Sequence, residues 1–199
     1  MKRFFGILAI TLLIVIGVVY TWSERIADGR KLPASNSVKM RISAGGVTVV
    51  GIRDNDYRVT FEDASPELVK QAKIEIKRDH QPVVINLSQL PEGSRVRVEV
   101  PETSNIAVEM GAGELQLHNI HGSKYAMLRS GKLVVDIGTR DEYSKAEASV
   151  LAGALHAPAF DADKGGMFRC FTTRGSGKLA LAAHVSAGEL VLQNGPLEK

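Results

Sequence analysis

A short phrase recurs through this chain and limits what it can fold into. The phrase is a small or polar residue, a glycine, and then apolar residues that alternate with polar ones. A strand this short cannot bury its apolar face alone, but copies stacked on one another can. The glycine suits a sharp corner that needs a positive φ. The phrase therefore predicts an all-β fold of the β-solenoid (β-helix-like) type, with copies at Gly45, Gly113, Gly131, Gly153, Gly177 and Gly188.

Period-two alternation of apolar and polar residues predicts further strands, each with one face in a core and one in water. It occurs at residues 38–42, 57–61, 74–76 and 96–100. One short helix is expected at residues 67–72, because Ser65 is a good N-cap and Pro66 suits the first helical position. Within the repeated phrase, we expect the leucine (Leu115, for example) to face the core and the residue before it (Glu114) to face solvent.

An antiparallel sandwich of hairpins is the competing architecture. Hairpins favour two-residue Asn-Gly or Asp-Gly turns. Beyond Asp28-Gly29 in the N-terminal part, the sequence holds one such pair, Asn194-Gly195. This scarcity favours stacked coils over hairpins.

The N-terminal segment predicts a membrane anchor. Lys2 and Arg3 precede an uncharged run that begins at Phe4 and ends at Trp22. As a helix, its roughly 19 residues would span about 28 Å, close to the thickness of the bilayer hydrocarbon. The basic residues favour a cytoplasmic N-terminus, and Tyr20 and Trp22 suit the opposite interface. We expect one transmembrane helix at residues 1–23, a linker at 24–37 and the β-repeat domain at 38–199.

Cleavage of this segment as a secretory signal is the alternative. The small-x-small cleavage sites are poor or lie far beyond the apolar run. Cys170 is the one cysteine, so disulfides cannot report the compartment. The expected location is therefore a bacterial cell membrane, single-pass, with the C-terminal domain outside the cytoplasm, or a secreted or periplasmic protein after cleavage.

Charge and aromatic content bear on partners. A net charge of +3 with 6% aromatic residues does not favour nucleic acid, which needs stacking rings in a basic groove. The first half places basic residues at outward strand positions, which suits anionic polymers or lipid headgroups, or simply a solvated face that discourages aggregation. These positions are Lys39, Arg41, Arg58, Lys73, Lys77, Arg95 and Arg97.

The order of these elements resembles the bacterial β-strand-repeat family described as putative adhesins. The resemblance rests on the phrase at residues 42–51, on the strand 96–100 followed by Pro101 that leads to residues 113–117, and on the later Gly-x-Leu copies. It covers roughly residues 38–195. The resemblance implies an extracytoplasmic β-helix-like domain, frequently behind a membrane segment, without established catalytic residues. The sequence departs from the pattern at residues 154–166, where small residues dominate.

Few side chains suggest a metal or a cofactor. His118 and His121 could share a metal, but nearby Cys, Asp or Glu ligands are missing and solvated turn histidines are favoured. The opening of a calcium loop is suggested by Asp54-Asn55-Asp56, without the loop's glycine and distal glutamate, so a polar turn is favoured.

The remaining candidates concern catalysis. Asp161 and Asp163 lie in what is expected to be the longest flexible connection, with Lys164-Gly165-Gly166, and paired carboxylates could cleave a polysaccharide. Cys170 is expected to lie in a strand as a buried small hydrophobe. Gly175-Ser176-Gly177 lacks the lysine and hydroxyl residue of a phosphate loop. We assign no catalytic, cofactor-binding or metal residues and expect no cofactor.

The expected function is a non-enzymatic, membrane-tethered β-repeat module for adhesion, scaffolding or envelope sensing. Its expected partners are the membrane, through the run from Phe4 to Trp22, and an envelope protein or an anionic polymer. The alternatives are a polysaccharide-active enzyme on a β-helix and an accessory subunit of a membrane regulator.

Overall fold

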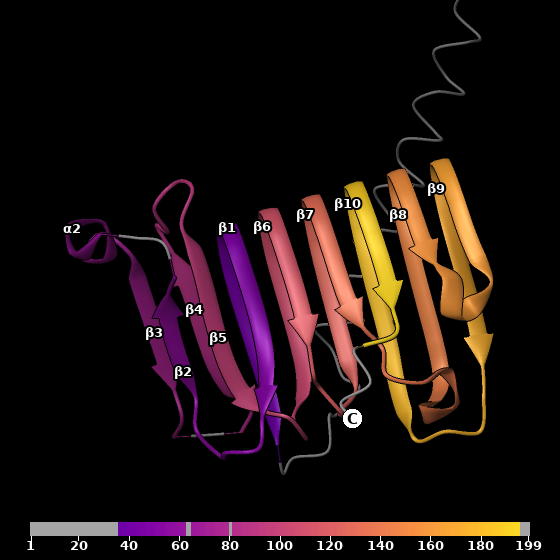
Figure 1. Cartoon of the computed structure of the whole chain (residues 1–199), viewed down its shortest axis with the longest axis horizontal. Helices are drawn as coiled ribbons and strands as arrows, with labels where there is room; N and C mark the ends of the chain where they lie inside the picture. The colour runs from indigo at the N-terminus through magenta and orange to yellow at the C-terminus, as the bar shows by residue number, and fades with distance from the viewer. Residues whose placement is uncertain (1–35, 63–64, 80, 196–199) are drawn as a thin grey trace, which may run out of the picture. The chain divides into compact units, whose positions relative to one another are not determined.

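The computed structural model describes residues 36–62, 65–79 and 81–195. Within them the chain is all-β, apart from one short helix and two 3-10 turns (Figure 1). The expected membrane segment lies outside these residues, and none of the helices described is long and apolar enough to span a bilayer. The elements are β1 (Ser37–Ile52), β2 (Arg58–Phe61), α2 (Pro66–Val69), β3 (Lys73–Lys77), β4 (Val83–Ser88), β5 (Arg95–Pro101), β6 (Asn105–His118), β7 (Lys124–Asp136), η1 (Arg140–Glu142), β8 (Tyr143–Ala157), η2 (Pro158–Phe160), β9 (Ala162–Arg174) and β10 (Leu179–Gln193).

The strands form one sheet whose long members run in parallel. The order is β2-β5-β1-β6-β7-β10-β8-β9, with β4 and then β3 attached to the first half of β1. The pairs β1–β6, β6–β7, β7–β10 and β10–β8 are parallel, which a sandwich of hairpins would not give. Antiparallel pairing is confined to the flanks, at β2–β5, β3–β4 and β8–β9.

Each long strand bends at the glycine of the repeated phrase, which we call the glycine corner. The corner glycines of neighbouring strands are paired with one another. All have a positive φ, between +109° and +137°, which side-chain-bearing residues rarely adopt. A Cβ at any of the four glycines that follow Gly45 along the parallel strands would overlap the carbonyl oxygen of the glycine before it in the row. The row is Gly45, Gly113, Gly131, Gly188, Gly153 and Gly166.

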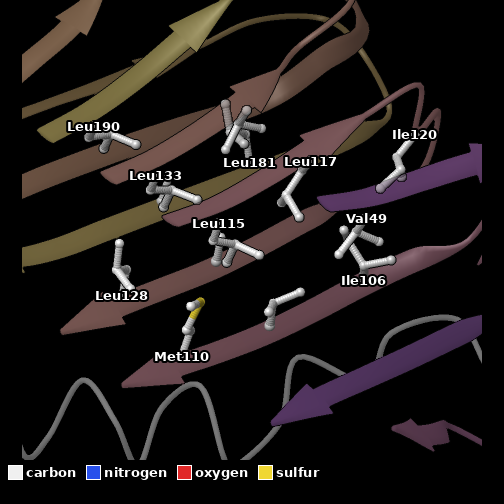
Figure 2. Packing of buried hydrophobic residues seen from close by; sticks show 14 of the residues in the cluster. Val49, Ile106, Met110, Leu115, Leu117, Ile120, Leu128, Leu133, Leu181 and Leu190 are labelled. Atoms are coloured by element: carbon white, nitrogen blue, oxygen red, sulfur yellow. The ribbon is translucent and has the colours of Figure 1, made fainter. Parts of the chain in front are cut away.

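The bend shifts the alternation of inward and outward side chains. In β1, Ile42 is the last buried residue before the corner and Val47 the first after it, five residues later. The two halves of each strand therefore contribute to a single core (Figure 2). The prediction that the leucine of the repeated phrase faces the core is confirmed, because Leu115, Leu133 and Leu155 are fully buried. Burial of each such side chain contributes about 1.5–3 kcal/mol.

Outside the core, the residue after the corner glycine is exposed or shared between strands. Glu114 is exposed, as expected. Lys132 and Glu189 are half-buried and form an ion pair of 3.2 Å between β7 and β10.

The strand order departs from simple sequential stacking. β10 lies between β7 and β8, although β8 and β9 precede it in the chain. Gly177 was expected to mark a corner, but it lies in the turn before β10, and Gly166 occupies the corner position in β9. The expected flexible connection at residues 161–166 is thus wrong: most of it is the first part of a strand antiparallel to β8. The predicted helix is reduced to the four residues of α2, and β4 is a further strand that was not among those predicted.

Candidate functional site

A row of polar side chains lies at outward positions of β6, β7 and β10, and its central residue, Asp136, is buried between its neighbours. The Nδ1 atom of His118 lies 2.7 Å from Oδ2 of Asp136, and Nε2 of Gln193 donates to Oδ1 of Asp136 over 2.8 Å. The other ring nitrogen of His118 lies 2.9 Å from Oε1 of Gln116, whose amide nitrogen donates to Glu114. Burial opposes ionisation of Asp136, but the hydrogen bonds from His118 and Gln193 outweigh it and lower the pKa of that carboxyl.

This row corrects the expectation of a solvated turn histidine for His118, whereas His121 agrees with it. His118 is not a solvated turn residue, since its side chain is 29% exposed and held on both sides. His121 is exposed beyond the end of β6, and its backbone N–H donates to Glu102. Among the residues that the structure describes, no group of three or more His, Cys, Asp or Glu side chains is placed to hold a metal ion.

The repeated phrase could have identified the row. His118, Asp136 and Gln193 each stand five residues after a corner glycine, at Gly113, Gly131 and Gly188. Because corner glycines are paired in register, residues at equal distances from them lie side by side. Aligning the copies on their glycines would have predicted the contacts.

A second polar pair lies inside the core. Lys124 takes an inward position of β7, between Ile106 of β6 and Leu181 of β10, and is 1% exposed. Its Nζ donates to the hydroxyl oxygen of Tyr143 over 2.8 Å, and that hydroxyl donates to the carbonyl of Ile137 over 2.8 Å. The Lys124 ammonium also lies 5.4 Å from the centre of the Tyr143 ring.

Burial shapes the ionisation of this pair. It lowers the pKa of Lys124 to about 8, although Glu142 and Asp136 pull in the opposite direction. It raises the pKa of Tyr143, with a further contribution from Glu142. The buried pair of Lys124 and Tyr143 is suited to holding the first residues of β7 and β8 together, and a substrate cannot reach it.

We predict that Lys124 makes stability rise with pH in the alkaline range. In the unfolded chain the amine keeps its proton up to its ordinary pKa of 10.5, but in the folded chain it begins to lose it near 8. Since the unfolded state binds more protons between these values, the free energy of unfolding should increase by about 2 kcal/mol from pH 8 to 9.5. Above pH 10, ionisation of Tyr143 in the unfolded chain should oppose the gain. Denaturant unfolding of the native chain and Lys124→Met at each pH checks this, and a parallel rise in both would contradict it.

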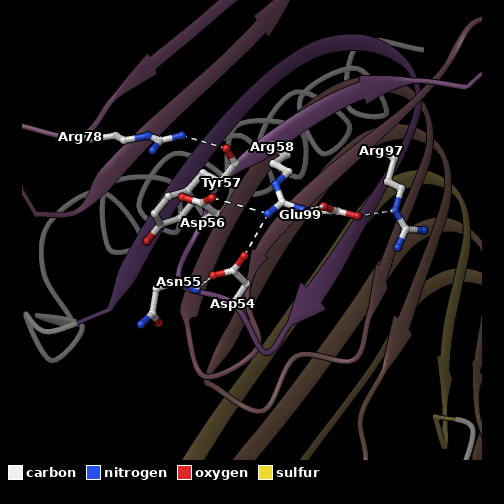
Figure 3. Close-up of polar contacts among 8 residues, drawn as sticks. All are labelled: Asp54, Asn55, Asp56, Tyr57, Arg58, Arg78, Arg97 and Glu99. Atoms are coloured by element: carbon white, nitrogen blue, oxygen red, sulfur yellow. Dashed lines mark hydrogen bonds and ion pairs between the residues drawn. The ribbon is translucent and has the colours of Figure 1, made fainter.

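The acidic turn after β1 forms a cluster around one arginine (Figure 3). Arg58 hydrogen-bonds Asp54 over 2.9 Å and lies 3.5 Å from Asp56 and 3.6 Å from Glu99. Glu99 also accepts from Arg97. The predicted polar turn is confirmed, with a cation of the chain itself between its carboxylates.

Other outward basic residues are also paired. Lys39 lies 3.9 Å from Glu109, and Lys77 lies 3.0 Å from Glu75. With Arg58 and Arg97, at least four of the seven basic positions singled out in the sequence have a carboxylate neighbour. Such pairing weakens the field that would attract an anionic polymer.

The carboxylates that suggested polysaccharide cleavage do not face each other. Asp161 is 91% exposed and lies 3.6 Å from Arg140. Asp163 is 78% exposed, lies in β9 and contacts His156 over 2.8 Å. Cys170 also lies in β9, but the expectation that it is buried is wrong, because it is on the exposed edge strand.

β9 closes its end of the core with charged side chains. Lys164 is paired with the buried Leu155, and Arg169 with the buried Val150, so both take inward positions. Lys164 Nζ donates to the carbonyl of Cys170 over 3.1 Å, and Arg169 Nε donates to that of Gly165 over 2.6 Å. Inward charges on an edge strand discourage pairing with another chain.

We predict that Lys164→Leu/Arg169→Leu converts this end into an aggregation site. The double variant should form large assemblies in light scattering at concentrations where the native chain does not. Arg174→Leu/Lys178→Leu removes the same charge from exposed positions and is the matched control. Equal aggregation of both variants would show that net charge, and not the position of Lys164 and Arg169, prevents the chains from associating.

Comparison with known proteins supports the fold. No protein-family model matches the chain, and no curated protein sequence matches it. Among solved structures, the chain is similar to the crystal structure of a putative cell adhesion protein from Clostridium sporogenes, with 12% identity and a TM-score of 0.52. The match covers 81% of this chain and 93% of that one. At this identity the likeness establishes a shared fold.

Proposed function

We propose that the chain is a non-enzymatic module with an adhesion-related role, presented outside the cytoplasm and tethered to the bacterial membrane by the run from Phe4 to Trp22. The observation that carries the adhesion proposal is the likeness to a putative cell adhesion protein over most of both chains. We further propose that the stacked, corner-bent strands are a short β-solenoid, with β10 inserted out of order.

The polar side chains support a contact surface in preference to a reaction centre. His118, Asp136 and Gln193 satisfy one another along a strand row, and Lys124 with Tyr143 is enclosed. Because much of the outward basic charge is paired, an envelope protein fits this surface better than an anionic polymer does.

Adhesion is tested with beads that carry the full chain. We expect retention on bacterial cells well above that of beads carrying Gly131→Ala, which has almost the same composition but should lose the fold. A protein partner predicts that retention survives moderate salt, whereas attraction to an anionic polymer fades as salt screens charge. Retention no greater than that of the Gly131→Ala beads would refute the adhesion proposal.

Topology is tested with a reporter that is active only outside the cytoplasm, fused after residue 199. An active reporter on a chain of full length supports the anchor. A shortened chain would replace tethering by secretion, and an inactive reporter would overturn the location.

A further inference from the structure

We propose that two copies of the chain join through the end of the sheet opposite β9, around a two-fold axis through the glycine corner. This end, called here the β2/β3 end, consists of the outer edges of β2 and β3 with the inward side chains Val59, Phe61, Ile74 and Ile76. The proposal concerns self-association and stands apart from the adhesion proposal.

The β2/β3 end is an open end of the core. Each of the two strands pairs on one side only among the residues described, β2 with β5 and β3 with β4. Ile74 is 38% exposed, and Val59, Phe61 and Ile76 are half-buried. At the opposite end, β9 places Lys164 and Arg169 at inward positions and also exposes Met167 and Phe168. The two ends therefore differ in their inward positions: β9 holds charged residues there, whereas β2 and β3 hold only apolar ones.

The backbone of β2 is prepared for a further strand. The N–H of Glu62 donates to the carbonyl of Arg95 over 2.9 Å, so Glu62 directs its backbone groups toward β5. Since these directions alternate along a strand, Val59 and Phe61 direct theirs to the outer edge. Figure 1 shows β2 and β3 at this end of the sheet, with α2 joining them near the corner.

The glycine corner fixes how a second copy would fit. β3 extends the first half of the bent sheet and β2 the second half. A two-fold axis through the corner exchanges the halves, so β3 of one copy meets β2 of the other in antiparallel orientation. The inward residues nearest the corner must then meet, and these are Ile74, which is level with Ile42, and Phe61, which is level with Val47.

This register brings apolar residues together without further adjustment. Ile74 lies opposite Phe61 of the second copy, and Ile76 lies opposite Val59. The same contacts occur twice because the axis repeats them, and such an isologous interface closes at two copies. Cross-strand apolar pairs of this kind are each worth a fraction of a kcal/mol beyond burial, so we expect a reversible dimer.

The outward residues are electrostatically compatible in the same register. Lys73 meets Glu62 of the second copy. Lys77 meets Arg58, which sits among the carboxylates of Asp54, Asp56 and Glu99 (Figure 3). Arg97 accompanies Glu99, and Arg78 donates to the carbonyl of Tyr57 beside Asp56, so three guanidinium groups balance the three carboxylates. Lys77 therefore approaches a cluster of balanced charge.

A disulfide between outward positions tests the register. Thr60 and Glu75 are exposed on opposite outer surfaces of one copy, but they are partners across the proposed axis. In the full chain with Cys170→Ser, we expect Thr60→Cys/Glu75→Cys to form at least tenfold more covalent dimer under mild oxidation than either single cysteine variant. Yields equal to those of the single variants would overturn the proposal.

A charge substitution tests the interface without oxidation. Ile76→Lys should lower the dimer fraction of the full chain in sedimentation equilibrium at least tenfold, with an unchanged circular dichroism spectrum. Met167→Lys, which alters an exposed apolar residue of β9, is the matched control and should dimerise like the native chain. A native chain that stays monomeric throughout the tested concentrations, or a dimer that Met167→Lys weakens and Ile76→Lys does not, would refute the arrangement.

Discussion

Gly131→Ala is expected to cost roughly 4 kcal/mol or more, enough to leave most of the chain unfolded. Gly131 holds a φ of +125° at the corner of β7, and its strand is enclosed by β6 and β10. An added Cβ would overlap the carbonyl oxygen of Gly113, which belongs to the backbone and cannot rotate away. Relief would require the corner row to separate and the parallel ladders on both sides to break.

Two other glycines separate the causes of this effect. Gly165 has open space around its Cβ position and no positive φ, so Gly165→Ala should change stability by less than about 0.5 kcal/mol. Gly93 has a φ of +74° but the same open space, so Gly93→Ala should cost about 1–2 kcal/mol through backbone strain alone. Denaturant unfolding of the three variants measures the series. If Gly131→Ala lowered the free energy of unfolding no more than Gly93→Ala does, close packing of the corner row would not contribute to stability.

Tyr143→Phe is expected to destabilise the chain by about 3 kcal/mol although it removes a single oxygen. The ring would stay packed, since Tyr143 is 2% exposed. The Lys124 ammonium would lose the acceptor at 2.8 Å, and the carbonyl of Ile137 would lose its donor. The ammonium would keep only its long, 3.5 Å hydrogen bond to the carbonyl of Gly122, and a poorly partnered buried charge is far more costly than the missing hydroxyl itself.

The second variant of this pair tests the explanation. Lys124→Met replaces the buried cation by an apolar side chain of similar length, and it should be tolerated at pH 7. In the Lys124→Met background, Tyr143→Phe should cost only about 1 kcal/mol, for the Ile137 carbonyl. The double-mutant cycle therefore predicts a coupling energy of about 2 kcal/mol. Additive effects would mean that the two side chains do not depend on each other.

The sequence predicted the corner and the core better than the ends. A glycine followed by an alternating strand predicts both the bend and the leucine that faces the core. Leu115, Leu133 and Leu155 are buried as expected. A strand was expected around Cys170, but the first part of β9 was not predicted, because inward positions that are usually apolar hold the charges of Lys164 and Arg169 and the alternation that identifies a strand is absent there. Cys170 was misplaced for the same reason, because an edge strand exposes residues of types that are normally buried.

Local sequence patterns do not predict contacts between residues that are far apart in the chain. Lys124 looks like an outward residue by type, and its burial depends on Tyr143, which lies 19 positions away. The partnership of His118 with Asp136 becomes visible when the copies are aligned on their glycines. Strand order has no such signal, because each copy of the phrase can pair with any other.

The place of β10 has a consequence for how the chain is made. The ribosome releases β7, β8 and β9 before β10, yet β10 joins β7 to β8. Until residues 179–193 emerge, the growing chain has two unfinished sheet edges that cannot pair correctly with each other. Completion of the sheet must therefore wait for the last strand, and a stalled or truncated chain ending before residue 179 is expected to be a substrate for chaperones and proteases.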